Sequence, residues 1–388
     1  MVFTFSSNAE LVFGVGAESN LERLLRANQA RSILFVYSGN YVFDLGIHRL
    51  VTEVSSRIGA ELIESGSVVP NPRIELVSEL ITTSREPPVD FVLAAGGASS
   101  FDTAKAVGIG VLHDHDVWDF FTGKTQPKST LPVGVISTIP GSGSELSDCA
   151  VLQLGHDKRA LETNVIVPKF AIVNPEYSRS APYRYQAAAV ADLAVGFLEP
   201  YFTDKAHIES ADRLLEGGFI AAINAGKRFA SDPADLQVRT ELHWLSAVMY
   251  NHCFLATGSE NDWTTHRLEH EIGGQFDVIH GEGIAAILPS IIRYVSNRKP
   301  QRYAQLAVRA LHADPFDSND KQLAELLANA LEQYFDTLGL ATRLSQLGIE
   351  QNDFESIAER LTLGDTKTVG NYSPLDKNDV LNVLELAR

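Results

Sequence analysis

The sequence predicts a two-domain protein, with an α/β domain first and an all-helical domain second. The chain has 388 residues, which is more than a single hydrophobic core usually organises. Up to about residue 173, short runs rich in β-branched residues alternate with helical stretches, an arrangement typical of a parallel sheet with helices. Beyond Asn174-Pro175 the strand signal stops, and apolar residues follow the helical period to the end.

Four apolar runs in the first half are predicted to be buried strands. These runs are Ser32–Tyr37, Phe91–Ala95, Leu131–Ser137 and Phe170–Val173. Val69-Pro70-Asn71-Pro72 predicts a turn, because proline disfavours helix at the residue before it, and a helix is expected over Ile74–Ser84. Residues 1–5 lack the basic and apolar segments of a signal peptide and are predicted to open a strand.

The second half is predicted to consist of amphipathic helices. The clearest helical periods cover Leu214–Phe229, Leu236–Phe254 and Leu323–Leu338. Prolines and serines gather between residues 175 and 182, as is common at a junction. We therefore predict an α/β domain over residues 1–178 and an all-helical domain over residues 179–388.

Composition excludes several classes of function. The net charge of −17 repels phosphate backbones and anionic lipid, and no run of lysine or arginine reverses it locally. No segment has the roughly 20 apolar residues of a membrane helix. Two cysteines, Cys149 and Cys253, are too few for a disulfide framework. We expect a soluble, cytoplasmic protein that binds neither nucleic acid nor membrane.

A glycine-rich turn follows the strand predicted at Phe91–Ala95. The segment Gly96-Gly97-Ala98-Ser99-Ser100 leads directly into a helix that carries Asp102. Glycines let a backbone approach a pyrophosphate closely, and the first N–H groups of a helix attract anions. A turn that needs glycine only for its own geometry would look the same.

A second turn of small and hydroxylated residues follows the next predicted strand. It runs from Thr138 to Glu145, Thr-Ile-Pro-Gly-Ser-Gly-Ser-Glu. Ligands of open α/β sheets bind outside the carboxyl ends of neighbouring strands. The two turns together therefore favour a nucleotide site.

Three histidines lie within fifteen positions in the helical half. His266 and His270 are four residues apart, which places them on one helix face, and His280 follows. Imidazole is a common ligand of zinc and iron, so the cluster predicts a metal site, although any one of these histidines could be structural. The string His266-x-x-Glu269-His270 also matches the inverted zinc-peptidase signature, in which the glutamate is the general base.

Together these motifs resemble the iron-containing alcohol dehydrogenases, and most closely the butanol-dehydrogenase-like branch that includes NADPH-dependent aldehyde reductases. The resemblance extends from Phe13-Gly14-Val15-Gly16 to the C-terminal helix. It implies a Rossmann-like dinucleotide-binding domain, an all-helical domain of the dehydroquinate synthase-like kind, and a metal in the cleft between them. The implied reaction is reversible hydride transfer between NAD(P)H and a carbonyl, and we expect a homodimer.

The resemblance also assigns the cofactor site. The residues that it places around the nucleotide are Gly39, Asn40, Tyr41, Gly96, Gly97, Ala98, Ser99, Asp102, Thr138, Ser142, Ser144 and Lys158. Asp102 would in addition face the nicotinamide and the substrate, and the resemblance implies a catalytic role for it. Gly39 stands where NAD-preferring relatives carry an acidic residue that binds the ribose 2′-hydroxyl. We therefore expect NADP(H) to be favoured over NAD(H).

For the metal, the resemblance implies Asp192, His266 and His280 as ligands of one iron or zinc ion. The family has a further histidine four residues after the aspartate, and this chain has Gly196 there. We expect a metal that binds but is weakly held. His270 matches a family histidine that points into the cleft without binding metal, and we assign it a catalytic role. The alternatives are a metal-free relative that binds the nucleotide and, less favoured, a zinc peptidase.

Overall fold

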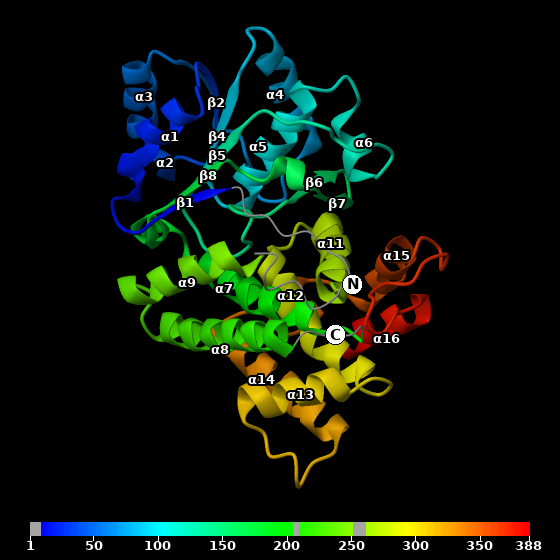
Figure 1. Ribbon diagram of the computed structural model, residues 1–388. Coiled ribbons are helices and arrows are strands. Elements are labelled where there is room, and N and C mark those ends of the chain that lie inside the picture. Colours follow the sequence, from blue (N-terminus) through cyan, green and yellow to red (C-terminus); the bar gives the residue numbers. More distant parts are fainter. Residues whose placement is uncertain (1–8, 205–208, 251–260) are drawn as a thin grey trace. The chain divides into compact units, whose positions relative to one another are not determined.

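The computed structural model describes residues 9–204, 209–250 and 261–388 (Figure 1). The strand predicted at residues 1–5, the end of the helix predicted over Leu236–Phe254, and Cys253 lie outside the described residues. By internal packing, the described chain forms two compact units. One is an α/β unit of residues 9–181 with Ser246–Tyr250, and the other is a helical unit of Pro182–Leu245 with residues 261–388. The domain boundary predicted between residues 178 and 179 stays a prediction.

A six-stranded parallel sheet organises the α/β unit. Its strands are β1 (Glu10–Phe13), β2 (Ser32–Tyr37), β3 (Glu61–Ser65), β4 (Phe91–Gly96), β5 (Val133–Ser137) and β8 (Phe170–Val173). They lie in the order β1-β8-β5-β4-β2-β3, and every neighbouring pair is parallel. The four predicted strands are confirmed as β2, β4, β5 and β8. They are apolar throughout because helices cover both faces of the sheet.

Alternate residues of each strand feed two separate cores. Ile33 and Phe35 of β2 pack with helices α1 (Leu21–Ala27) and α3 (Ile47–Ile58). Leu34 of the same strand faces the other layer. That layer contains α4 (Ile74–Arg85), α5 (Ala98–Val111) and α6 (Val117–Phe121). The helix predicted over Ile74–Ser84 is thus confirmed as α4, one residue longer.

An antiparallel hairpin in this unit was not predicted. Strands β6 (Cys149–Leu154) and β7 (Asp157–Glu162) pair so that Leu154 lies opposite Asp157. The turn between them contains Gly155 at a φ of 57°, a left-handed conformation that glycine adopts readily. Strand β6 packs against helix α5.

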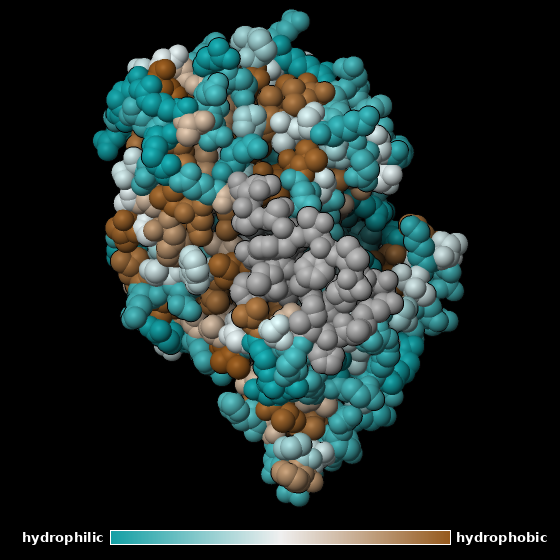
Figure 2. Space-filling view, viewed as in Figure 1, coloured by the Kyte–Doolittle hydropathy of each residue, from teal (hydrophilic) through white to brown (hydrophobic). Residues whose placement is uncertain are grey.

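The helical unit contains nine long helices among its described residues. They are α7 (Tyr183–Leu198), α8 (Glu209–Ser231), α9 (Leu236–Met249), α11 (Thr264–Phe276), α12 (His280–Val295), α13 (Gln301–Leu311), α14 (Asp320–Thr337), α15 (Gln351–Leu361) and α16 (Lys377–Leu386). The last turn of α9, from Ser246, is grouped with the α/β unit. Helix α12 is central and packs against α7, α11, α14 and α16. This confirms the predicted all-helical second half. Among the described helices, none combines the length and apolarity needed to cross a bilayer, and the face in Figure 2 is mostly hydrophilic.

Candidate functional site

Helix α7 supplies a buried aspartate to the helical unit. Asp192 is only 7% exposed, in a stretch of small apolar residues that lets neighbouring helices come close. A Cβ atom on Gly281 would overlap the carbonyl oxygen of Ala188, so the first turn of α12 lies directly against α7. Glycine at position 281 therefore allows His280, the first residue of α12, to approach Asp192.

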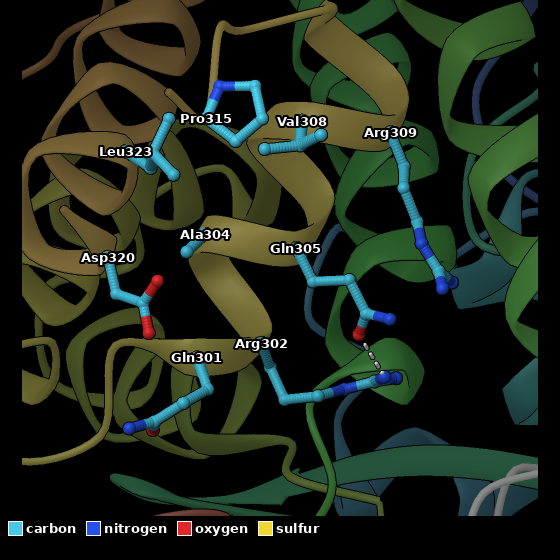
Figure 3. Close-up of a pocket in the computed structure, with 9 residues that line it drawn as sticks. All are labelled: Gln301, Arg302, Ala304, Gln305, Val308, Arg309, Pro315, Asp320 and Leu323. Carbon is cyan, nitrogen blue, oxygen red and sulfur yellow. Dashed lines mark hydrogen bonds between the residues drawn. The ribbon is translucent and has the colours of Figure 1, made fainter. Parts of the chain in front are cut away.

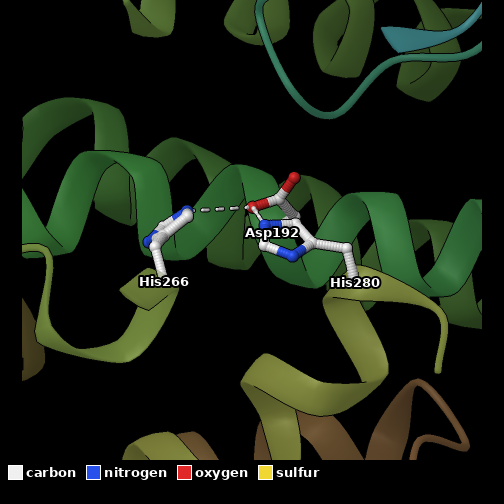
Figure 4. A group of neighbouring side chains, drawn as sticks. All are labelled: Asp192, His266 and His280. Carbon is white, nitrogen blue, oxygen red and sulfur yellow. Dashed lines mark ion pairs between the residues drawn. The ribbon is translucent and has the colours of Figure 1, made fainter. Parts of the chain in front are cut away.

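The three residues that the resemblance implies as metal ligands, Asp192, His266 and His280, lie close together (Figure 4). Asp192 Oδ1 lies 3.4 Å from His266 Nε2 and 3.7 Å from His280 Nε2. Asp192 Oδ1 and His266 Nε2 are both buried, and neither has a hydrogen-bond partner among the described residues. Buried polar atoms are rarely left unsatisfied, and one carboxylate with two imidazoles is a typical donor set for zinc or iron. The residues present therefore fit a divalent metal.

Two further carboxylates contact the outer sides of the imidazoles. Glu199 accepts a hydrogen bond from His266 Nδ1, and it also accepts from the backbone N–H of Thr265 at 2.6 Å. Glu269 contacts His280 Nδ1. Sequence reasoning missed Glu199, although its spacing of seven residues from Asp192, two helical turns on one face, was an available signal.

The electrostatics of this cluster favour positive charge at its centre. Burial alone would raise the pKa of Asp192, but His280 and His266 hold it below its ordinary value. Burial would likewise raise the pKa of Glu199, but His266 and the hydrogen bonds from Thr265 hold that pKa below its ordinary value. Burial would lower the pKa of His266, whereas Glu199 and Asp192 raise it to about 10. The two carboxylates thus stabilise a cation between them.

The geometry disfavours the zinc-peptidase alternative. That signature requires His266 and His270 to share one metal while Glu269 activates a water. Here His266 groups with Asp192 and His280, whereas His270 groups with Glu269 and His280. Glu269 is fully buried and lies against the Nδ1 atom of His280, on the side away from Asp192.

Gly196 lies within α7, one turn after Asp192, and the helix is continuous through it. Among the described residues, the cluster around Asp192 therefore offers three side-chain ligands. A metal bound there would keep at least one coordination position for water or substrate.

The glycine-rich turn of the α/β unit has the predicted form of a strand, a tight turn and a helix. Gly96 has a φ of 145°, a conformation that few other residues adopt, and a Cβ atom there would lie 2.5 Å from Ser100 Oγ. Helix α5 begins at Ala98 without a side-chain cap. Its first N–H groups can therefore receive an anion.

Gly97 has a second role that the sequence did not reveal. Its backbone is extended, and a Cβ atom there would lie 2.8 Å from Ile139 Cγ2 of the second turn. Glycine at this position thus also allows the two turns to pack together. Replacement of Gly97 by valine should therefore disturb the packing between the two turns as well as the approach of a ligand.

A buried lysine ties the second turn to helix α5. The ammonium group of Lys105 donates to the carbonyl oxygens of Ser144 at 2.7 Å, Ser147 at 3.0 Å and Cys149 at 2.7 Å. The Ser144 hydroxyl donates to Asp102 Oδ1 at 2.6 Å. Burial raises the pKa of Asp102, and Lys105 opposes that rise. The Asp102 carboxylate belongs to this network, and its predicted place beside the nicotinamide stays a prediction.

The remaining predicted cofactor residues follow the carboxyl ends of β2 and β5, apart from Lys158, which lies in the β6-β7 hairpin. Strands β2, β4 and β5 are neighbours, and the Thr138 N–H donates to the Gly96 carbonyl at 2.9 Å. Gly39 follows β2 with a φ of 71°, and the Tyr41 hydroxyl lies 2.7 Å from Ser38 Oγ. Ser142 Oγ accepts from Ser144 N–H. Lys158, on β7, is buried and lowers the pKa of Asp102.

A groove of about 410 Å³ elsewhere in the helical unit is separate from these features. The residues that line it are Gln301, Arg302, Ala304, Gln305, Val308, Arg309, Pro315, Asp320 and Leu323 (Figure 3). Arg302 is bound to both oxygens of Asp212, and Arg309 pairs with Glu216. The groove therefore lacks cations directed toward an anionic ligand, and it contains none of the predicted site residues.

Comparison with known proteins gives consistent matches over the whole chain. The model "Iron-containing alcohol dehydrogenase" matches residues 8–175, and "Fe-containing alcohol dehydrogenase family, C-terminal" matches residues 187–388. The chain is 28% identical over 386 residues to NADH-dependent butanol dehydrogenase A of Clostridium acetobutylicum, covering 99% of this chain and 98% of that protein. It is 27% identical to the NADPH-dependent aldehyde reductase YqhD of Escherichia coli, covering 100% and 99%. The crystal structure of a butanol dehydrogenase A from Thermotoga maritima superposes with a TM-score of 0.94 at 26% identity, covering 100% and 98%.

Proposed function

The chain belongs to the iron-containing alcohol dehydrogenases, oxidoreductases that act on CH–OH groups with a nicotinamide nucleotide, and we propose that Asp192, His266 and His280 hold its divalent metal. The observation that carries this proposal is that Asp192 Oδ1 and His266 Nε2 are buried, face each other at 3.4 Å and have no hydrogen-bond partner among the described residues. The substrates are alcohols and aldehydes, and the ion is iron or zinc. A homodimer is the assembly we expect, which sedimentation velocity would measure.

The chain's own residues prepare the site for hydride transfer. When bound, a divalent ion supplies Lewis acidity toward a carbonyl oxygen. Asp192 provides negative charge, and the two imidazoles present Nε2 atoms whose direction is fixed by contacts on Nδ1. We assign proton exchange at the substrate oxygen to His270, whose ring centre lies 5.7 Å from that of His280.

A matched pair of experiments tests this function. Wild-type protein should oxidise NADPH in the presence of aldehydes. Its rate of aldehyde reduction should be proportional to its metal content. Asp192→Asn, His266→Ala and His280→Ala should each lose metal and aldehyde reduction together while still binding NADPH, because the nucleotide turns lie in the α/β unit. Normal rates in these variants, or a fully active wild type after exhaustive chelation, would favour a metal-free relative in which His270 acts without the ion.

For the cofactor, we propose that NADP(H) is favoured over NAD(H) because Gly39 places no carboxylate at the end of β2. The relatives are divided, since the Clostridium enzyme is named NADH-dependent and the Escherichia enzyme NADPH-dependent. Gly39 is left-handed, a conformation that aspartate and asparagine tolerate better than most residues. Gly39→Asp should therefore raise the KM for NADPH about tenfold or more, whereas uncharged Gly39→Asn should not. A wild type with equal KM values for both cofactors would contradict this preference.

A further inference from the structure

Glu199 and Glu269 each contact the Nδ1 atom of one of the two histidines in the proposed metal site. We propose that they are positioning residues, each holding the Nδ1 side of one imidazole so that both Nε2 atoms face Asp192. In this arrangement they compensate for the ligand that Gly196 does not provide. The inference rests on the proposed metal site and deepens it.

Glu199 is placed to orient His266 in more than one way. It is 1% exposed and sits where α7 passes into a short 3-10 turn, while its carboxylate reaches the start of α11. One oxygen accepts from Thr265 N–H at 2.6 Å, and the other contacts both the ring and the backbone N–H of His266. The ring of His266 is thereby fixed with Nδ1 outward and Nε2 toward Asp192.

Glu269 performs the equivalent task for His280 from one turn further along α11. It is fully buried, and a Cβ atom on Gly283 would lie 2.8 Å from its Cγ, so glycine in α12 makes room for it. Its carboxylate contacts His280 Nδ1, while His280 Nε2 lies 3.7 Å from Asp192. The two imidazoles are thus supported by separate carboxylates from separate helices.

The charge of these two groups matters most when protein ligands are few. A carboxylate that accepts from Nδ1 makes the opposite nitrogen a stronger donor to metal, and loss of such a partner commonly costs about 10–100-fold in affinity. Three side chains are placed to hold an ion here, so each donor would contribute a larger share than in a site with four protein ligands. The outer carboxylates therefore determine whether this site retains metal.

Cobalt(II) binding tests the inference without recourse to catalysis. The metal-free full-length protein is titrated with cobalt(II) against a competing chelator, and the visible absorption of the bound ion is recorded. Glu199→Gln and Glu269→Gln keep an acceptor for Nδ1 but remove charge, and each should weaken binding about tenfold or more. The alanine variants should weaken it further and alter the spectrum, because the ring is no longer oriented. Glu271→Gln is the matched control: Glu271 is buried in the same helix but pairs with Arg360.

The outcomes separate this inference from the proposed function. If wild type binds no cobalt(II), the metal site itself is wrong. If wild type binds and the glutamine and alanine variants bind as tightly as Glu271→Gln, the positioning role is overturned while the metal site stands. Circular dichroism checks that each variant is folded, and NADPH affinity should be unchanged. Should one variant not fold, the other still decides the matter for its own imidazole.

Discussion

Gly196 is the residue at which this chain departs most clearly from the expected ligand set. It lies one turn after Asp192 in a continuous helix, so a side chain there would share the face of Asp192. Gly196→His should therefore add an imidazole ligand and slow metal loss to a chelator by roughly tenfold or more. Activity should fall if the open position receives substrate.

Gly217→His is the control for that variant. Gly217 lies in α8 with open space around it, so the substitution gives the same gain in helix propensity without approaching the metal ligands. Equal rates of metal loss from both variants would show that position 196 does not face the ion.

A second residue gives a prediction about pH. His243 is completely buried, and neither ring nitrogen has a hydrogen-bond partner among the described residues. Burial, with a contribution from Arg239, lowers its pKa to about 3. The folded pKa thus lies below the ordinary value of about 6.5, so this group's contribution to stability is complete above pH 6.5 and is lost as the pH falls toward 3.

The expected loss for His243 between pH 7.5 and 5.5 is on the order of 1 kcal/mol in the free energy of unfolding. Urea denaturation at the two pH values measures it. His243→Met, of similar volume and without a titrating group, should remove this part of the pH dependence. An unchanged pH dependence in the variant would show that His243 is hydrated or paired in solution.

For single residues, the sequence indicated the kind of site well, but it did not show which side chains contact one another. The spacing of His266, His270 and His280 indicated a metal site, but only the family resemblance singled out Asp192. Glu269 was considered as a peptidase base because the one-dimensional pattern cannot show which imidazole nitrogen it faces. Glu199 was missed because its partner lies 67 residues away in the chain.

Among the elements, helix α5 depends on its buried lysine. The Lys105 ammonium donates to the carbonyl oxygens of Ser144, Ser147 and Cys149, which lie in the second turn, after it and at the start of β6, and the Asp102 carboxylate opposes the lowering of its pKa by burial. Lys105→Met should lower the free energy of unfolding by about 3 kcal/mol, since removing one member of a buried charged network leaves the other uncompensated. NADPH affinity should fall as the turn loses its anchor, and cobalt(II) affinity should not.

Lys124→Met provides the comparison, because Lys124 is exposed and pairs with Asp119 at the surface. Surface pairs contribute little, so its denaturation curve should match the wild type. A Lys105→Met variant that unfolds like Lys124→Met would contradict the anchoring role.

Helices with one apolar face and strands with a continuous apolar run could be predicted from the sequence, whereas the other elements could not. β2, β4, β5 and β8 are buried on both faces, which produces an unbroken apolar run. β1 and β3 lie at the two edges of the sheet and are partly exposed, so their sequences carry a weaker signal. Strand β7 of the β6-β7 hairpin begins with three consecutive charged residues, which resemble a loop when the partner strand is unknown.

For the whole molecule, the change of periodicity near residue 174 was sufficient to predict an α/β part followed by a helical part. The spacing of apolar residues predicts the layers of a fold well, because burial recurs with a regular period along each helix and strand. It does not specify which distant side chains meet, and the proposed metal ligands come from three helices, α7, α11 and α12.

The net charge of −17 leads to a prediction about cofactor capture. A negative protein repels an anionic nucleotide at long range, and salt screens that repulsion over a distance of about 10 Å at 0.1 M. The association rate constant of NADPH should therefore increase a few-fold from low to physiological ionic strength, and more than that of NADH, which lacks the additional phosphate. Stopped-flow fluorescence measures both. A rate that falls with salt would indicate that local cations dominate.

The contacts of Glu199 have a consequence for observing the metal directly. The same carboxylate that contacts the ring of His266 also receives the backbone N–H groups of Thr265 and His266, at the first turn of α11. A metal ion that immobilises the ring should therefore also stabilise these two backbone hydrogen bonds. Deuterium uptake at the amides of Thr265 and His266 should accordingly slow when the ion is bound and quicken when it is stripped, so that two amide hydrogens report occupancy of a site that has no colour of its own when filled with zinc.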